Sequence, residues 1–178
     1  GAGPVRPRLG RGAALGRAER RQPGMTLWDW AVAAYRAGGV ADACLELQDA
    51  AGQNVPLLLW AAWCAAEGRM PDPETLEAAS DTARVWEETA ISPLRAVRRA
   101  LKTRAPDLDD AAREAVRAEV KAVELAAERR LLGALEALAP APSGSAHATL
   151  EAMVAVARVW SPMTPRAGLV RLAERLPA

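Results

Sequence analysis

The sequence is poor in the residues that favour β-strands. It has no Phe and one Tyr, and aromatic residues make up 4% of its 178 residues. Runs of β-branched and aromatic side chains, which pack well in sheets, are missing. Ala, Leu, Arg and Glu dominate instead, and these side chains lose little rotamer freedom in a helix. The composition therefore predicts an all-α fold.

Long hydrophobic runs are missing as well. The most hydrophobic segment, residues 55–66, has about a dozen residues, whereas a helix that crosses a bilayer needs roughly 18 or more. We therefore expect no membrane span and no membrane partner. The two cysteines, Cys44 and Cys64, lie in helical patterns without CxxC or Cys/His spacing, which is typical of small buried residues in a reducing compartment. The sequence thus predicts a cytoplasmic protein.

The scarcity of histidine limits the catalytic chemistry. The single histidine, His147, falls in a stretch rich in Pro, Ser and Gly, and neither cysteine has a base near it in the sequence. Ser-His-Asp and Cys-His sites are therefore not expected. Glycine-rich phosphate loops, HExxH helices and EF-hand loops are also absent from the sequence. It predicts no catalytic residue, no metal and no cofactor, and it favours a non-enzymatic role.

Charge and composition divide the chain into four parts. Residues 1–24 hold six arginines and one acidic residue, so we expect a disordered Arg-rich tail, with the natural start at Met25. The rest has 17 basic and 21 acidic residues, a net charge of −4. Residues 25–138 are predicted to form a helical domain. Residues 139–148, an Ala/Pro/Ser/Gly linker, lead to a C-terminal helical segment over residues 149–178, and its packing on the core stays open.

Capping signals predict about six helices between residues 26 and 138. Thr26, Asn54 and Asp72 can each cap the first turn of a helix, and Ser92-Pro93 repeats the start signal of Asp72-Pro73. Residues 55–66 are apolar on most sides, which places their helix at the centre of the core. The last helix is long and has an apolar stripe, which consists of Val116, Val120, Val123, Ala127, Leu131, Leu135 and Leu138. We expect a compact all-α bundle with the C-terminal helical segment attached.

An ordered series of motifs resembles a known family. The motifs are Leu27-Trp28-Asp29-Trp30-Ala31, Cys44-Leu45-Glu46-Leu47-Gln48-Asp49, Gly52-Gln53-Asn54-Val55, Leu57-Leu58-Leu59-Trp60 and Lys121-Ala122-Val123-Glu124-Leu125. Together they are similar to small, mostly proteobacterial proteins that carry a domain of unknown function. The similarity covers about residues 26–138. It implies a bacterial cytoplasmic helical protein, and it implies no activity.

The best candidate ligand site is the polar turn between the second and third predicted helices. Asp49, Gln53 and Asn54 lie at two helix ends, where free N–H groups can bind an anion or a carboxylate. Arg95 and Arg99 of the fifth predicted helix could hold the same ligand. The structural alternative, which we favour, is that Asn54 caps its helix while Asp49 and Gln53 satisfy the backbone of the turn.

A basic helix face is a second candidate. Arg95, Arg98, Arg99 and Lys102 could contact the phosphates of nucleic acid or a small anionic ligand. Acidic residues stand close by in the sequence, and the net charge after the tail is negative. Structural ion pairing is therefore the favoured interpretation, and nucleic acid is not the expected partner.

A third candidate is a polar cluster on the sixth predicted helix. Lys121, Glu124 and Glu128 share one face of that helix. Two carboxylates could bind a metal or act as acid and base. The Glu-x-x-His pairs of di-iron bundles are missing, so an ion-paired surface is favoured and no metal site is predicted.

Two hypotheses of function follow. The first is a non-enzymatic protein-interaction or adaptor module, which binds another protein through an exposed groove or through residues 149–160 as a docking helix. The second is a small anionic-ligand or phosphate-binding protein, with a weak enzyme as a variant of it, that uses Asp49, Gln53, Asn54, Arg95 and Arg99. Nucleic-acid binding through the fifth helix is a variant of the second.

Overall fold

A computed structural model describes residues 24–177 of the chain. Within these residues the structure is all-α, with eight α-helices, one π-helical turn and no strand, which confirms the predicted fold class. The Arg-rich tail expected over residues 1–24 lies outside the described part except for Gly24. None of the described helices is long and apolar enough to cross a membrane.

Local capping explains where the early helices begin. The helices are α1 (Leu27–Arg36), α2 (Val40–Asp49), α3 (Val55–Ala66) and α4 (Pro73–Trp86). The predicted caps are confirmed, because the side chains of Thr26, Asn54 and Asp72 accept hydrogen bonds from the backbone three residues further on. Gly39, which precedes α2, has φ +80°. This backbone conformation is strained for residues that have a Cβ, and glycine has none.

The boundary predicted at Ser92-Pro93 is wrong in one respect. The chain does not leave the helix there, since a π-helical turn (Glu87–Ile91) joins α4 directly to α5 (Ser92–Ala100). The Ser92 N–H donates to the carbonyl of Glu87, five residues back, and the Ser92 hydroxyl donates to the Glu87 carboxylate at 2.7 Å. A widened turn makes room for Pro93, which has no N–H and would otherwise crowd the preceding turn.

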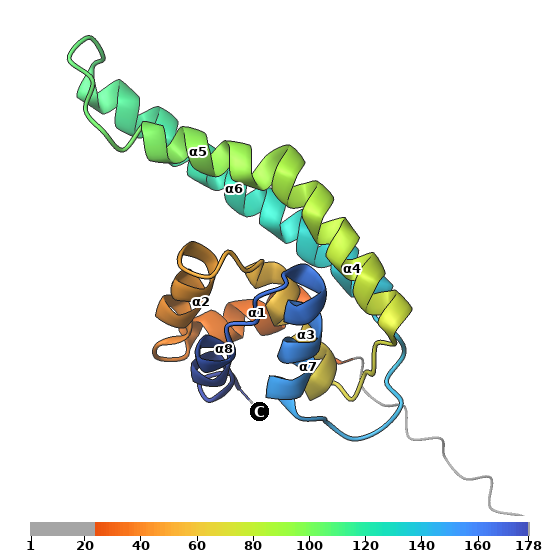
Figure 1. Cartoon of the computed structure of the whole chain (residues 1–178). Coiled ribbons are helices and arrows are strands. Elements are labelled where there is room, and N and C mark those ends of the chain that lie inside the picture. Colours follow the sequence, from red (N-terminus) through yellow and green to blue (C-terminus); the bar gives the residue numbers. More distant parts are fainter. Residues whose placement is uncertain (1–23, 178) are drawn as a thin grey trace, which may run out of the picture.

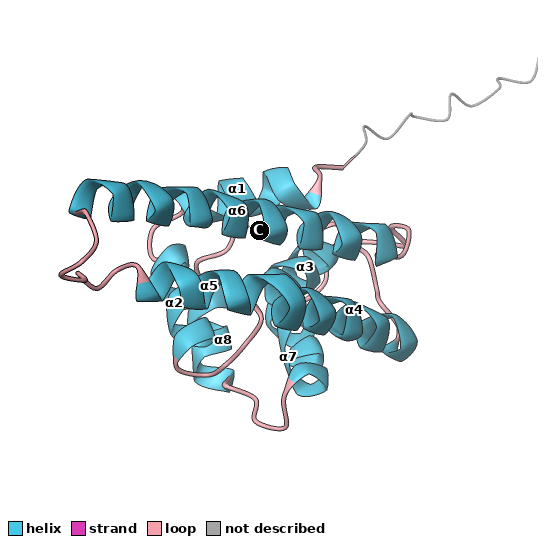
Figure 2. Cartoon of the chain, turned by 90° about the horizontal axis from the view of Figure 1, so that it is seen from above, coloured by secondary structure: helices cyan, strands magenta, loops and turns pink. Residues whose placement is uncertain are grey.

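Helices α4 and α5 pack beside the long α6 (Asp110–Leu138) and form a hairpin that extends beyond the other helices (Figures 1 and 2). The predicted apolar stripe of α6 is buried only in part. Leu131 and Leu135 are buried, whereas Val116 and Val123 are exposed. Leu138 at the end of α6 is exposed as well, so three of the seven predicted stripe residues face solvent.

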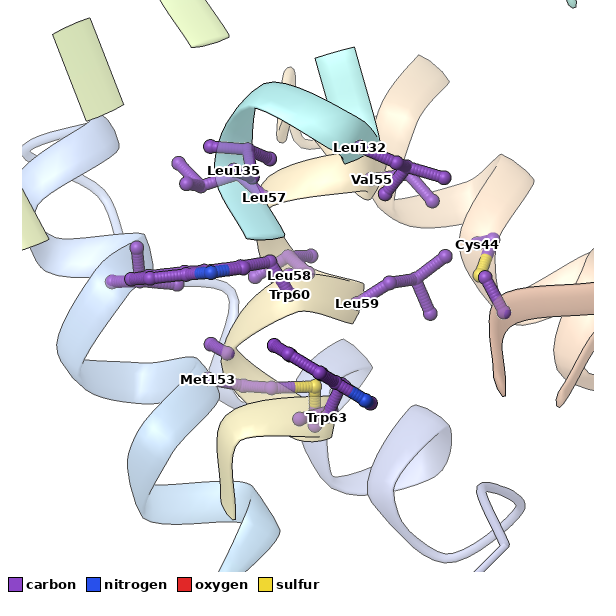
Figure 3. Close-up of a cluster of buried hydrophobic side chains, with 14 of the residues drawn as sticks. Cys44, Val55, Leu57, Leu58, Leu59, Trp60, Trp63, Leu132, Leu135 and Met153 are labelled. Atoms are coloured by element: carbon purple, nitrogen blue, oxygen red, sulfur yellow. The ribbon is translucent and has the colours of Figure 1, made fainter. Parts of the chain in front are cut away.

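The core is centred on α3, as predicted. Its side chains from Leu57 to Ala65 are all buried, which matches a helix that is apolar on most sides. The C-terminal helices α7 (Thr149–Trp160) and α8 (Arg166–Ala173) pack on this body. The C-terminal helical segment, whose packing the sequence left open, is therefore part of the core structure. Figure 3 shows Met153 of α7 close to Trp60 and Trp63 of α3.

The segment between α6 and α7 is tied to the body by backbone hydrogen bonds. Ser143 N–H donates to Gly68 O, and His147 N–H donates to Ala65 O, both at 2.9 Å. Gly68 has φ +65°, and a Cβ at this position would collide with the carbonyl oxygen of Gly144. Glycine is therefore required at the end of α3 for α7 to return to the core.

Candidate functional site

A polar cavity of about 250 Å³ lies where the turn between α2 and α3 meets α5 and the end of α7. Four of the five residues predicted for a ligand site line it, namely Asp49, Gln53, Arg95 and Arg99. The other lining residues are Gln48, Gly52, Glu87, Ser92 and Trp160. The polar turn and the basic helix, selected separately from the sequence, thus come together in space.

Asn54 is the predicted residue that does not line this cavity. Its side-chain oxygen accepts a hydrogen bond from the Leu57 N–H at 3.0 Å, and its amide nitrogen donates to Glu87 at 3.2 Å. Both ends of the side chain are therefore used within the protein. Asn54 caps α3 and connects it to the π-helical turn.

Arg95 is the centre of an ion-pair network behind the cavity. Its guanidinium lies 3.1 Å from Glu87, 3.3 Å from Glu124 and 3.6 Å from Glu128, and its side chain is nearly buried. Three carboxylates from the π-helical turn and α6 thus surround one cation. Burial of such a group is tolerated only when its charge is compensated in this way.

Two further arginines of α5 are also paired. Arg98 donates to Glu124 at 2.6 Å, and this hydrogen bond raises the pKa of Arg98. Arg99 lies 3.1 Å from Asp49 at the rim of the cavity, where both side chains are exposed. Each of these arginines therefore has a carboxylate partner, as expected for structural ion pairing.

The three residues of the predicted cluster on α6 line one hollow, but their contacts differ. Glu124 is 7% exposed, and with Glu128 it faces the arginines of α5, whereas Lys121 is exposed and takes part in none of the ion pairs between described residues. Burial, together with the nearby charge of Glu124, raises the pKa of Glu128. No group of three or more metal-binding side chains was found in the described part of the chain.

Charge within the site weighs against an anionic ligand. The network contains three cations, Arg95, Arg98 and Arg99, and four carboxylates, those of Asp49, Glu87, Glu124 and Glu128. The positive charge that a phosphate would need is already compensated. The same pairing weighs against nucleic acid at this face of α5.

Gln53 is the polar side chain that the network does not use. It is 3% exposed, and both its side-chain oxygen and nitrogen are buried without a hydrogen-bond partner among the described residues. Only its backbone N–H is used by the turn, in a bond to Leu47 O at 3.0 Å. An unpaired buried amide costs about 1–3 kcal/mol. The expectation that this side chain satisfies the turn backbone is therefore not met.

Sequence reasoning missed Glu87, Ser92 and Trp160. Glu87 and Ser92 face each other only because a π-helical turn separates them, and no sequence pattern indicated that turn. Trp160 lies in the segment expected beyond the linker, and its indole N–H donates to Gly52 O at 2.9 Å. Its position depends on how α7 packs, which the sequence left open.

A second hollow adjoins the polar cavity, since Gln48 lines both. This α1–α6 groove has a volume of about 530 Å³ and is lined mainly by apolar side chains of α1, the start of α3 and α6. Its lining includes Trp28, Val32, Tyr35, Val55, Pro56, Leu59, Leu125 and Leu132. It continues along α6 into a hollow of about 440 Å³, since Leu125 and Glu128 line both.

These features define an all-α protein in which a small polar cavity and a wide apolar groove lie beside an ion-pair network. The chain belongs to a family described as proteins of unknown function (DUF2390), whose model matches residues 26–135. The family resemblance predicted from the motifs is thereby confirmed. The match includes every predicted site residue and excludes Trp160 and the rest of α7. No curated protein and no solved structure is significantly similar to the chain.

Proposed function

We propose that the chain is a protein-interaction module that binds its partner in the α1–α6 groove. The observation that carries this proposal is the apolar lining of the groove, where the exposed Tyr35 and Leu125 stand beside the buried Leu59. A concave apolar surface with a charged rim is the kind of surface to which an amphipathic helix of another protein binds.

The projecting hairpin supports the proposal. Leu125, which lines both parts of the groove, is 55% exposed. Single exposed apolar residues are common on protein surfaces, but here Leu125 continues an apolar lining. A partner segment that covers Leu125 would add apolar contacts to the part of α6 that the body leaves open.

The C-terminal segment does not supply the docking element that the sequence suggested. The apolar side chains of α7, among them Met153, Val154 and Val156, are buried in the chain's own core against α3. A helix whose apolar face is already covered cannot offer it to a partner. The proposal therefore depends on the groove alone.

We further expect the module to act in the cytoplasm. Cys44 and Cys64 are both free thiols and both buried in the core. A protein with unpaired cysteines suits a compartment in which thiols stay reduced.

Site-specific photo-crosslinking tests the proposal. A photoreactive phenylalanine analogue replaces Leu125 in the full chain, expressed in cells of its source organism. The matched control places the same analogue at Val85, which is 63% exposed on α4 and lines neither part of the groove. We expect a discrete protein adduct from position 125 and none from position 85.

A groove variant completes the test. Val32→Asp puts a charge into the groove lining, and it should remove the adduct from position 125 while the chain stays folded, because Val32 is only partly buried. Equal adducts from positions 125 and 85, or no adduct from either, would contradict the proposal. An adduct that survives Val32→Asp would show that the partner binds the hairpin outside the groove.

A further inference from the structure

We infer that the partner segment of the α1–α6 groove is an acidic amphipathic helix, whose apolar stripe faces the groove and whose flanking carboxylates pair with cations at the rim. This inference rests on the proposed function, since it names the class of partner for the same groove. It adds the sign of the partner's charge, which the apolar lining alone does not define.

The groove has the length of a short helix. Helices α1, α3 and α6, which supply most of its lining, pack on one another, and Leu59 of α3 is a buried part of that lining. Along α6 the lining extends from Lys121 to Leu132. This is a span of about 16 Å at a rise of about 1.5 Å per residue, or roughly three helical turns. A partner helix of three turns, with an apolar side chain on each turn, fits this span.

Three cations at the rim have no carboxylate partner among the described residues. Arg36 at the end of α1 and Lys121 of α6 are exposed, and each lines one part of the groove. Arg129 of α6 is exposed as well, and its guanidinium lies 4.7 Å from the ring centroid of Trp28, a lining residue. None of the three cations takes part in an ion pair between described residues.

The carboxylates near the groove, in contrast, already have partners. Glu124 is paired with Arg98 at 2.6 Å, and Glu128 lies 3.6 Å from Arg95. Asp29, the acidic residue of α1, lines neither part of the groove, and its carboxylate accepts a hydrogen bond of 2.8 Å from the hydroxyl of the N-cap. The charge that remains for a partner is therefore positive. Complementary charge at a rim speeds association and selects among partners, so an acidic segment is favoured.

The same observations weigh against three other occupants. Residues 1–23 of the chain carry a net charge of +5 in the sequence, which has the same sign as the rim. A two-fold dimer that placed this rim against itself would bring its cations together. Anionic lipid would match the charge, but Leu59 is only 2% exposed, and the flat surface of a bilayer does not enter a concave hollow.

Fluorescence anisotropy of three synthetic peptides with the full chain tests the inference. The acidic probe is an Ala-based helix of about 15 residues with a stripe of Leu at helical spacing and Glu on both sides of the stripe. In the basic probe Lys replaces each Glu. In the scrambled probe the Leu residues of the acidic probe are spread around the helix, so it also reports binding of acidic charge to the Arg-rich residues 1–23.

We expect the acidic probe to bind the parent chain at least tenfold more tightly than either of the other two. Its advantage over the basic probe should shrink at high salt, because salt screens exposed charges. Val32→Asp, which places a charge in the groove lining, should weaken the binding of the acidic probe at least tenfold.

A charge swap assigns the preference to the rim. The double variant Lys121→Glu with Arg129→Glu should bind the basic probe more tightly than the acidic one. The control, Lys102→Glu with Arg130→Glu, makes the same change of net charge at exposed residues that line neither part of the groove. It should keep the parent's preference. If the first double variant did not fold, Arg36→Glu alone should lower the ratio of the two affinities.

Failure of the inference can be told apart from failure of the proposed function. Equal affinities for the acidic and basic probes, no binding of any probe, or a charge swap without effect would overturn the inference. So would binding to phosphatidylglycerol vesicles, lost in Lys121→Glu with Arg129→Glu, by a chain that does not bind the acidic probe. In each case a protein adduct from position 125 that Val32→Asp removes would leave the proposed function standing, and its absence would overturn both.

Discussion

Arg95 of α5 and Glu124 of α6 form an ion pair of 3.3 Å between Nε and Oε1, and Glu124 also accepts a hydrogen bond of 2.6 Å from Arg98. No side chain of α5 is fully buried, so apolar packing alone fixes this helix only weakly. A nearly buried carboxylate shared by two arginines therefore connects the two helices of the hairpin. Such a pair is costly to break on one side, because the remaining charges stay buried without compensation.

We predict that Glu124→Gln lowers the free energy of unfolding by about 3 kcal/mol, the usual effect of removing one partner of a buried ion pair. Urea denaturation measures the change. Glu119→Gln is the control, because Glu119 is exposed on the same helix and takes part in none of the ion pairs between described residues. It should change stability by less than about 0.5 kcal/mol. Similar effects of the two substitutions would show that the network does not stabilise the hairpin.

A second prediction concerns the pH dependence of stability. Burial and the carboxylates of Glu124 and Glu87 raise the pKa of Glu128 above the ordinary 4.5, and Arg95 and Arg98 offset this only in part. The folded state thus holds this proton more tightly than the unfolded chain. The contribution of Glu128 to stability is therefore favourable at low pH and is lost as the pH rises through its folded-state pKa.

Glu128→Gln should therefore be more stable than the parent at neutral pH. This difference in stability should shrink as the pH falls toward 4.5, because Glu128 of the parent then takes up a proton and no longer carries a buried charge. Urea denaturation at a series of pH values checks this. Lower stability of Glu128→Gln at pH 7 would mean that the contact with Arg95 outweighs the cost of burying the charge.

A third prediction tests whether α7 belongs to the core. Met153 is fully buried against α3, so Met153→Ala should lower the free energy of unfolding by about 2–5 kcal/mol. Met163→Ala is the matched control, because Met163 is 80% exposed, and it should cost less than about 0.5 kcal/mol. A chain that ends at residue 148 should show no cooperative thermal transition. Cooperative unfolding of that shortened chain would refute the assignment of α7 to the core.

A fourth prediction concerns the thiols. Burial raises the pKa of Cys44 to about 11 and the pKa of Cys64 to about 12. Roughly one thiol in a thousand, or fewer, is then ionised at pH 8, and the thiolate is the reactive form. Iodoacetamide should label neither cysteine in the folded protein and both in urea, as followed by mass spectrometry. Equal rates of labelling in the two conditions would contradict the described burial.

The helices could be predicted because their signals are local. Thr26, Asn54 and Asp72 cap the helices that follow them through bonds that span three residues, and residues 55–66 are apolar on every side. Such features need no knowledge of the rest of the chain. The join between α4 and α5 escaped prediction because Pro93 is compatible both with a new helix and with the wide turn of a continuous one.

The candidate site could be predicted only in part, because its pairing is not local. The sequence placed charge on α5 and α6, and ion pairing was the favoured interpretation, but which carboxylate meets which arginine depends on how the hairpin closes. The free carboxamide of Gln53 could not be found from the sequence, since a glutamine at a turn usually bonds nearby backbone. Trp160 reaches the cavity only through the packing of α7.

The pairing of α3 with α7 also has a consequence during protein synthesis. The end of α3 and the end of α7 are separated by 94 positions, from Ala66 to Trp160. At the usual translation rate, roughly 5–20 s pass between the synthesis of these two points. During this interval α3 is part of the nascent chain without its main covering helix. The nascent chain therefore passes through a stage at which general chaperones would bind it at residues 55–66.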